Sequence, residues 1–262
     1  MNTAKIIAVT QPQITSYVDQ ANNDVKMSAE DFIAYCARVS NPQNQNNTLT
    51  APKLLKYPIT HKHWSPFEMV SVTMDIETTR DIAHQIVRHR SFSFQEFSQR
   101  YADPTKDMGF VTREARLQDH KNRQNSIETD DEKLEEWWKC RQKTIIKFAM
   151  KDYKQSIEKG IAKEQARAVL PEGLTKTRLY MSGTLRSWIH YIDVRAEEGT
   201  QKEHREIAIQ ARDEIINQFP SLVEYWFPVE DVRIGEYPDK GKTCCETCFR
   251  PFETKSWWEF WS

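Results

Sequence analysis

The sequence predicts an α+β protein in which an antiparallel sheet packs against several helices, one of them long. Residues 70–76 alternate apolar and polar side chains, which is the period of a half-buried antiparallel strand. Apolar residues recur at helical spacing over 129–160, which indicates a helix of about 30 residues. Strands and helices follow one another without regular β-α-β units, so a parallel sheet is not expected.

The other elements follow from local patterns along the chain. A helix should open at Ser28, where Asp31 completes a capping box, and should end near Pro42. A second helix is expected from about Thr78 into the basic residues 88–90. Further elements are expected as strands over 5–9 and 177–181 and as helices over 162–170, 185–192 and 207–215.

The long helix is predicted to be the structural spine of the protein. Thr129 and Glu132 resemble a capping box at its start, and Gly160 marks its end. One stripe of the helix is expected to face inward, and it comprises Leu134, Trp138, Arg141, Ile145, Phe148 and Ile157.

The simplest domain parse is one catalytic domain over 1–234 and an irregular tail over 235–262. Only seven glycines occur in 262 residues, and no two have the spacing of a Rossmann or P-loop phosphate site. Any phosphate must therefore be held by side chains or helix ends. Net charge is −1, and no run of apolar residues approaches the length of a membrane span.

Five cysteines, an odd number with no signal peptide in view, indicate a reducing compartment, which we take to be the cytoplasm. Cys244, Cys245 and Cys248 form a C-x-x-C pair typical of half a zinc site. One pair supplies too few ligands, so no metal is expected.

Residues 84–101 concentrate the groups that carry chemistry. This segment holds three arginines, two histidines, a glutamate and three serines, interleaved with phenylalanines. By charge alone it is typical of a solvated helix end, where cations suit the helix dipole. The aromatic backing instead favours a surface that binds a planar anionic ligand.

The pattern Arg88-His89-Arg90-x-x-Ser93-x-Gln95-Glu96-x-Ser98-x-Arg100 resembles the signature R-H-R-x-x-S-x-N-E-x-S-x-R of the flavin-dependent thymidylate synthases, the ThyX family. The resemblance extends over about residues 28–220. Other segments that match in the family's order are Ala37-Arg38-Val39-Ser40, His63-x-Ser65-Pro66-Phe67-Glu68, Arg167-x-Val169-Leu170-Pro171, Arg186-x-x-x-His190-x-x-x-x-Arg195 and Gln201-x-Glu203.

The resemblance implies reductive methylation of dUMP to dTMP, with methylenetetrahydrofolate as carbon donor, FAD as hydride relay and NADPH as reductant. It also implies an α+β fold and a homotetramer whose active sites combine residues of several subunits. Positions that match the family's FAD contacts are Ser40, His63, Ser65, Glu68, Arg88, His89, Arg90, Arg186 and His190. Positions that match its dUMP contacts are Gln85, Glu96, Ser98, Gln99, Arg100, Arg167 and Arg195.

The chemistry of the reaction suits these residue types. Carbon 5 of uracil is a poor nucleophile, and a permanent cation beside the ring stabilises the anion that activates it. Arg195 fits this role because a guanidinium stays charged and offers parallel donors, although an ion pair with Glu197 or Glu198 is the plain alternative. Ser98 is a conceivable nucleophile, but no Asp and His pair activates it, so we assign it positioning. None of the cysteines is a convincing nucleophile.

Three residues depart from the family pattern, each at an FAD contact or beside one. Gln95 replaces Asn in the signature, Met69 stands where His is usual, and Thr184 stands where Asn is common. Two rival functions stay open: an RNA- or nucleotide-binding module, which the balanced charge disfavours, and a flavin-binding assembly without catalysis, which the retained Ser98 and Arg195 disfavour.

Overall fold

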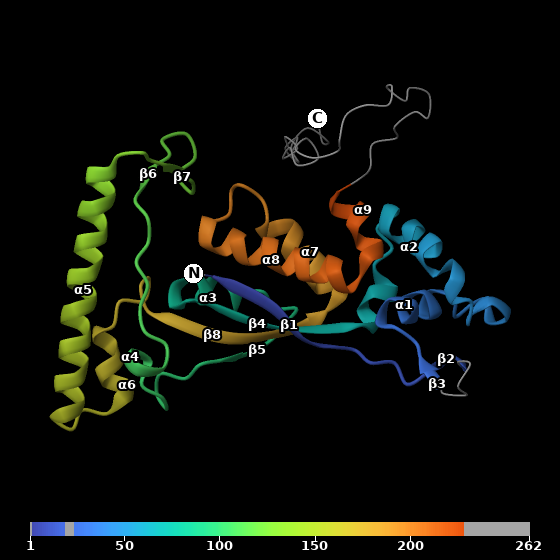
Figure 1. Ribbon diagram of the computed structural model, residues 1–262, viewed down its shortest axis with the longest axis horizontal. Helices are drawn as coiled ribbons and strands as arrows, with labels where there is room; N and C mark the ends of the chain where they lie inside the picture. The colour runs from blue at the N-terminus through green and yellow to red at the C-terminus, as the bar shows by residue number, and fades with distance from the viewer. Residues whose placement is uncertain (1, 19–23, 228–262) are drawn as a thin grey trace, which may run out of the picture. The chain divides into compact units, whose positions relative to one another are not determined.

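The computed structural model describes residues 2–18 and 24–227, shown in Figure 1. Its centre is a four-stranded antiparallel sheet with the strand order β1 (Thr3–Val9), β4 (Ser71–Thr79), β8 (Lys176–Thr184) and β5 (Ser93–Glu96). The predicted α+β class with an antiparallel sheet is confirmed. The tail over 235–262, with its cysteines, lies outside the described residues, as does the predicted boundary at residue 234.

The helices α1 to α9 are Ala29–Ala37, Ala51–Thr60, Arg80–Ile86, Pro104–Asp107, Glu132–Glu158, Lys163–Ala166, Leu185–Arg195, Lys202–Gln218 and Val223–Trp226. Short 3-10 helices lie at Pro42–Asn44, Thr48–Thr50, Ser65–Met69, Arg167–Val169 and Pro220–Leu222. Two small hairpins complete the described part, β2 (Thr15–Val18) with β3 (Asp24–Lys26) and β6 (Arg116–Gln118) with β7 (Ser126–Glu128).

One face of the sheet is the core of the protein. The predicted alternation in β4 holds, since Val72, Met74 and Ile76 are fully buried. Helices α7 and α8 run along this face (Figure 1), and the Trp188 indole donates a hydrogen bond of 3.0 Å to the carbonyl of Val72. The opposite face of β4 and β8 carries polar contacts such as the ion pair between Arg178 and Asp75. A sheet that is apolar on one side only therefore explains the period of two.

Close packing at β8 explains one of the few glycines. A Cβ atom on Gly183 would lie 2.4 Å from the ring of Phe92, which itself packs against Trp188 with ring centroids 4.9 Å apart. Only a residue without a side chain lets the segment after α3 approach the sheet this closely. Phe92 thereby leads the chain from the basic cluster into β5.

The sequence placed most elements but not all of their ends. The Ser28 cap is confirmed, because its hydroxyl oxygen accepts from the backbone N–H of Asp31 at 3.0 Å. The helix expected to run into 88–90 stops at Ile86, so the basic residues follow the helix and do not form its last turn. Helix α2 and strand β5 were not predicted, although the buried residues of α2 recur at helical spacing and the exposure of β5 alternates.

The long helix α5 exists but is not the spine of the fold. Its cap is Asp131, whose carboxylate accepts from the N–H groups of Lys133 and Leu134, and not Thr129. Much of the predicted inward stripe is uncovered: the exposed fractions of Ile145 and Phe148 are 49% and 59%.

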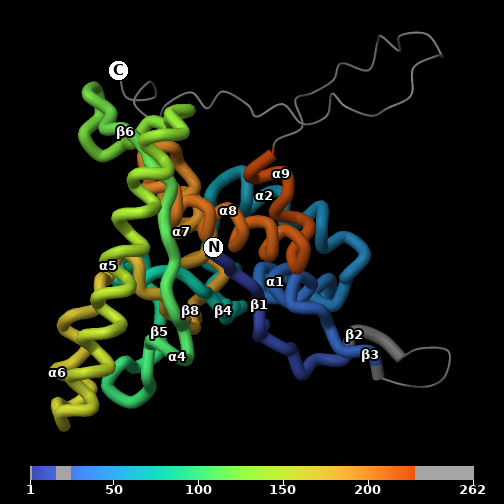
Figure 2. The backbone as a smooth tube through the Cα atoms, turned by 60° about the vertical axis from the view of Figure 1, so that its left-hand side comes forward, coloured from blue at the N-terminus to red at the C-terminus, as the bar shows by residue number. Residues whose placement is uncertain are grey.

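Helix α5 contacts a small satellite core instead of the central sheet. Ala149 and Tyr153 pack with Ala166 and Leu170 there. Figure 2 shows the segment before β6 running beside α5, and the Gln142 amide exchanges hydrogen bonds of 2.8 and 2.7 Å with the backbone of Arg113. The helix is thus fixed by its flanking segment, and one side of it stays free of contacts within the described chain.

Candidate functional site

Arg195 and His89 form the centre of a polar group at the end of α7. The Arg195 Nε–H donates to His89 Nε2 at 2.9 Å, and the ion pairs with Glu197 or Glu198 are absent from the described residues. Burial, with the charges of Arg195 and Arg88, lowers the pKa of His89 to about 4. The imidazole is therefore neutral at physiological pH and can accept the guanidinium's hydrogen bond.

Three further side chains extend this group into α3 and α8. The Gln85 amide donates to Gln201 Oε1 at 2.8 Å, and its oxygen lies 3.2 Å from His204 Nδ1. The ring of His204 is fully buried, and its Nε2 lies 3.0 Å from the hydroxyl of Tyr191. We call Gln85, His89, Arg195, Gln201 and His204 the arginine–histidine group.

Other predicted dUMP residues line a separate hollow. Its volume is about 450 Å³, and it is bordered by Ser98, Arg100, Tyr101, Ala162, Lys163 and Glu164. Arg100 lies 3.2 Å from the Glu164 carboxylate, and Arg167 donates to the Glu164 backbone carbonyl at 3.3 Å. Ser98 and Arg100 thus border the hollow, and Arg167 follows the short helix that carries Glu164 at its edge.

Two predicted dUMP residues are engaged in the protein's own structure. Glu96 accepts hydrogen bonds from Arg80 at 2.7 Å and from the Thr177 hydroxyl at 2.9 Å, which ties β5 to α3 and β8. Gln99 is 6% exposed, so its side chain contributes to the interior more than to an open surface.

The predicted FAD residues lie in two places. Glu68 pairs with Arg186 at the start of α7, and His190 packs edge-on against Trp64 with ring centroids 5.8 Å apart. His63 lies beside Tyr57, with centroids 5.7 Å apart. Ser40 is exposed in the turn after α1, and Ser65 is exposed at the start of the 3-10 helix Ser65–Met69. Arg38 fixes the segment after α1 by hydrogen bonds to the Asn47 carbonyl and the Thr50 hydroxyl.

Arg88 and Arg90 follow α3, on either side of His89. Both are exposed, and within the described residues neither guanidinium makes a hydrogen bond or an ion pair. Two exposed guanidinium groups without carboxylate partners suit the pyrophosphate of a dinucleotide, so the donor set fits FAD.

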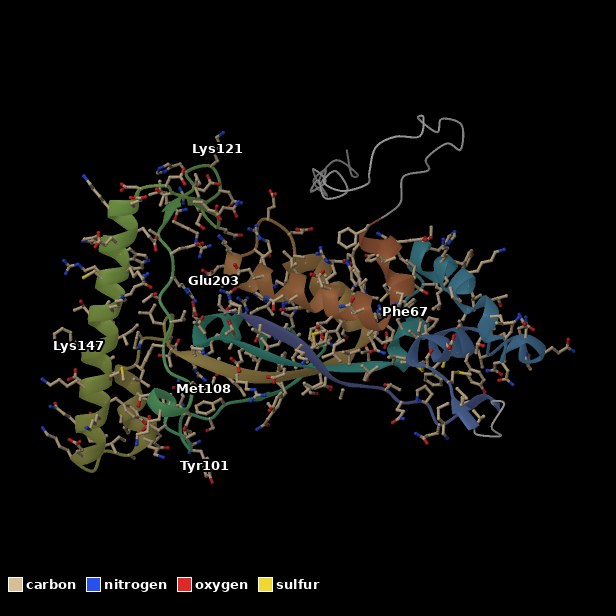
Figure 3. All side chains as sticks on the ribbon, in the orientation of Figure 1. Phe67, Tyr101, Met108, Lys121, Lys147 and Glu203 are labelled. Carbon is tan, nitrogen blue, oxygen red and sulfur yellow. The ribbon has the colours of Figure 1, made fainter. Side chains whose placement is uncertain are left out.

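One chain does not bring all of these residues together. Figure 3 shows Glu203, beside the arginine–histidine group, above the sheet, and Tyr101 of the hollow below it. Phe67, next to Glu68, lies at a third position. The predicted site residues therefore lie in three separate places of one chain.

Comparison with known proteins decides the family. The family described as thymidylate synthase complementing protein matches residues 24–221. A probable flavin-dependent thymidylate synthase of Paramecium bursaria Chlorella virus 1 is 49% identical over 84% of this chain and 97% of its own length. A flavin-dependent thymidylate synthase of Synechocystis sp. is 48% identical over 83% of this chain and 96% of its own. The chain belongs to the flavin-dependent thymidylate synthase family.

A solved structure shares the fold of this family member. The crystal structure of the UMP/dUMP methylase PolB from Streptomyces cacaoi, bound with 5-Br dUMP, has a TM-score of 0.66 and 22% identity, covering 87% of this chain and 95% of that one. The predicted resemblance and the predicted class of enzyme, a methyltransferase of the flavin-dependent thymidylate synthase type, are confirmed. Among the described residues, no helix is both long and apolar enough to cross a membrane.

Of the three departures from the family pattern, Thr184 has a visible structural role. Gln95 is exposed in β5 opposite Tyr180. Thr184 caps α7 by accepting from the N–H of Ser187 at 3.2 Å, and Met69 is 53% exposed.

His204 and Tyr191 were missed by the sequence reasoning. A signal for His204 was available, because it lies three residues before Ile207 on the apolar face of α8. A histidine at an apolar position of a helix indicates that its ring is buried and has a hydrogen-bonding partner inside the protein.

Proposed function

We propose that this protein methylates dUMP to dTMP, taking the carbon from methylenetetrahydrofolate and reducing equivalents from NADPH through FAD. The observation that carries the proposal is the fixed guanidinium of Arg195, held at 2.9 Å by a neutral His89 and next to the Gln85 amide network. Membership of the family, and relatives named for this activity, support it.

Arg195 binds and activates the pyrimidine. A guanidinium keeps its charge at any working pH and presents parallel donors to a uracil edge. The hydrogen bond to His89 removes most of the side chain's rotational freedom, so the charge is in place before the substrate arrives. Stabilising the uracil anion raises electron density at carbon 5, where the new carbon is attached. No cysteine nucleophile is required.

The hollow holds the phosphate of dUMP. Arg100, Arg167 and the Ser98 hydroxyl replace the missing glycine-rich loop, and Lys163 adds a cation at the rim. The Glu164 carboxylate forms an ion pair with Arg100 at 3.2 Å, so phosphate competes with this carboxylate for the guanidinium. Gln99 and Glu96 contribute by shaping β5 and the turn after it. Ser98 has a positioning role.

FAD is held by the remaining predicted residues. Arg88 and Arg90 bind its pyrophosphate. The rest of FAD is bound by the predicted residues nearer the start of α7, which are Ser40, His63, Ser65, Glu68, Arg186 and His190. Bound FAD supplies the hydride relay between NADPH and the carbon being reduced to methyl. His89 has a further role, since its Nε2 orients Arg195.

The active form is a homotetramer in the cytoplasm. The uncovered side of α5, where Ile145 and Phe148 are about half exposed, offers apolar surface to other subunits. The separation of the hollow from the arginine–histidine group supports sites shared between subunits. The compartment stays a prediction from the odd cysteine number.

Spectroscopy of the purified protein tests the proposal. A yellow protein with a flavin spectrum should be bleached anaerobically by NADPH, and dUMP should accelerate the bleaching. Addition of methylenetetrahydrofolate should then yield dTMP. A colourless protein that gains no flavin on incubation, or a flavoprotein that forms no dTMP with all substrates present, would overturn it.

A further inference from the structure

The amide and imidazole groups behind Arg195 form a chain of hydrogen bonds whose direction is fixed at one end. Glu203 accepts from Gln201 Nε2 at 2.9 Å, and it is ion-paired with Arg116. A carboxylate paired with a guanidinium can only accept hydrogen bonds, so Gln201 must turn its amino group toward Glu203. The oxygen of Gln201 then faces Gln85.

This orientation passes along the chain residue by residue. Gln85 must present its amino group to the Gln201 oxygen, at 2.8 Å, and its own oxygen to His204 Nδ1, at 3.2 Å. His204 Nδ1 must therefore carry a proton. In a neutral ring Nε2 is then an acceptor, and the Tyr191 hydroxyl donates to it at 3.0 Å.

The surroundings keep His204 neutral. The ring is fully buried, and Arg195 and His89 are the ionisable groups that affect it. Arg195 is a cation and His89 can only become one, so neither favours an imidazolium. Burial first, then the charge of Arg195 and, where it is protonated, of His89, lowers the pKa of His204 to about 3. Glu203 is separated from the ring by Gln201 and Gln85 and does not contact it. Burial also raises the pKa of Tyr191, whose hydroxyl therefore keeps its proton.

We propose that His204 is a positioning residue for substrate, which as the Nδ1–H tautomer locks the Gln85 amide so that its amino group faces the nucleotide. One N–H of Gln85 is taken by Gln201, and within the described chain the second has no partner. The half-exposed amide thus presents a donor to an oxygen of dUMP. A flipped amide would present its carbonyl and repel the same oxygen. This inference rests on the proposed function, which makes Gln85 a substrate contact.

The tautomer is tested directly by nitrogen NMR of the wild-type protein labelled with 15N-histidine. We expect His204, assigned by its loss in a His204→Gln variant, to show a protonated Nδ1 and a bare Nε2 at pH 7. A protonated Nε2 with a bare Nδ1, or an imidazolium, would overturn the proposal. This readout needs neither substrate nor turnover, so it separates failure of the inference from failure of the proposed function.

A matched pair of variants tests the positioning role. His204→Asn places an amide where Nδ1 was and keeps a donor to Gln85, whereas His204→Gln places its amide toward Tyr191 and loses that donor. We expect His204→Gln to raise the KM for dUMP about tenfold, with kcat within about twofold of wild type. His204→Asn should raise this KM less than threefold.

Gln142→Met serves as the control, since it removes a buried amide that lies outside the arginine–histidine group and bonds the backbone of Arg113. Its KM for dUMP should stay within about twofold of wild type, even where its melting temperature falls. Equal KM values for dUMP in His204→Asn and His204→Gln, or parallel losses of kcat, FAD content and melting temperature in both, would mean that His204 only fills the core.

Discussion

The arginine–histidine group and the hollow treat their arginines in opposite ways. Arg195 is half buried and its position is set by a neutral histidine, whose own ring packs against Tyr191. Arg100 is exposed, and its contact in the hollow is a single carboxylate on a short helix. In the proposed site, the first arrangement would be organised before substrate binds, whereas the Arg100 guanidinium would have to exchange its partner. Catalysis gains from the former, because pre-set charges cost no reorganisation in the transition state.

The largest effect should therefore come from the organised group. Arg195→Ala should nearly abolish dTMP formation and leave FAD bound, since an interaction stronger in the transition state than in the ground state is expressed in turnover. Single-turnover product formation and the flavin spectrum measure the two halves of this prediction. Arg195→Lys is the matched control: it keeps charge but loses the Nε–H that meets His89, and we expect it to stay well below wild type. Near-normal methylation by Arg195→Ala would show that the group has another purpose.

A second experiment asks whether the two regions meet across subunits. At a dUMP concentration too low to saturate the Arg100→Ala variant, a mixture of Arg195→Ala and Arg100→Ala proteins should be more active than either variant alone once subunits exchange, because mixed oligomers contain some sites free of both lesions. Native mass spectrometry confirms the exchange. If mixed oligomers form and are no more active than either variant alone, the group and the hollow serve one site from one chain, despite their separation in Figure 3.

The hollow itself should show a smaller, binding-type effect. Arg167→Ala removes one charge-assisted contact to phosphate, on the order of 1.5 to 3 kcal/mol, and should raise the apparent dUMP requirement about tenfold or more with kcat less affected. Titration with dUMP at saturating folate and NADPH measures it. Lys163→Ala, at the rim of the same hollow, should raise the requirement less. An unchanged dUMP titration for Arg167→Ala would leave Arg167 as a structural residue of the segment before Pro171.

The same contrast explains what the sequence could and could not reveal. The alternation of β4 and the cap at Ser28 are local signals, and the structure repeats them. The motif residues were found because their order along the chain is specific. Their pairing in space could not be found in this way. The hydrogen bond between Arg195 and His89 spans 106 positions and depends on how α7 packs against the end of α3.

Long-range packing also accounts for the error over α5. Its apolar stripe has the period of a core helix, but periodicity shows only that a face needs a partner and not which partner covers it. Within the described chain Phe148 is not covered by a partner, and the satellite core around Tyr153 buries only part of the helix. Sequence pattern therefore predicted the element correctly and its neighbour wrongly.

The smallest expected effect concerns stability and pH, and it isolates the organised group from catalysis. The folded protein holds His204 neutral with its pKa near 3 and His89 with its pKa near 4, while in the unfolded chain both titrate near 6.5. As the pH falls below about 6.5, these two histidines bind protons in the unfolded chain but not in the folded chain, so the free energy of unfolding decreases. The fully buried His204 contributes a slope of the unfolding free energy against pH that approaches about 1.4 kcal/mol per pH unit once the pH is well below 6.5.

Urea unfolding between pH 7 and 5 measures this slope in a range above most carboxylate titration. The His204→Gln variant should show a flatter slope because its amide does not titrate. A variant as pH-sensitive as wild type over this range would mean that His204 already binds a proton in the folded protein, and that the imidazole is not held neutral beside Arg195.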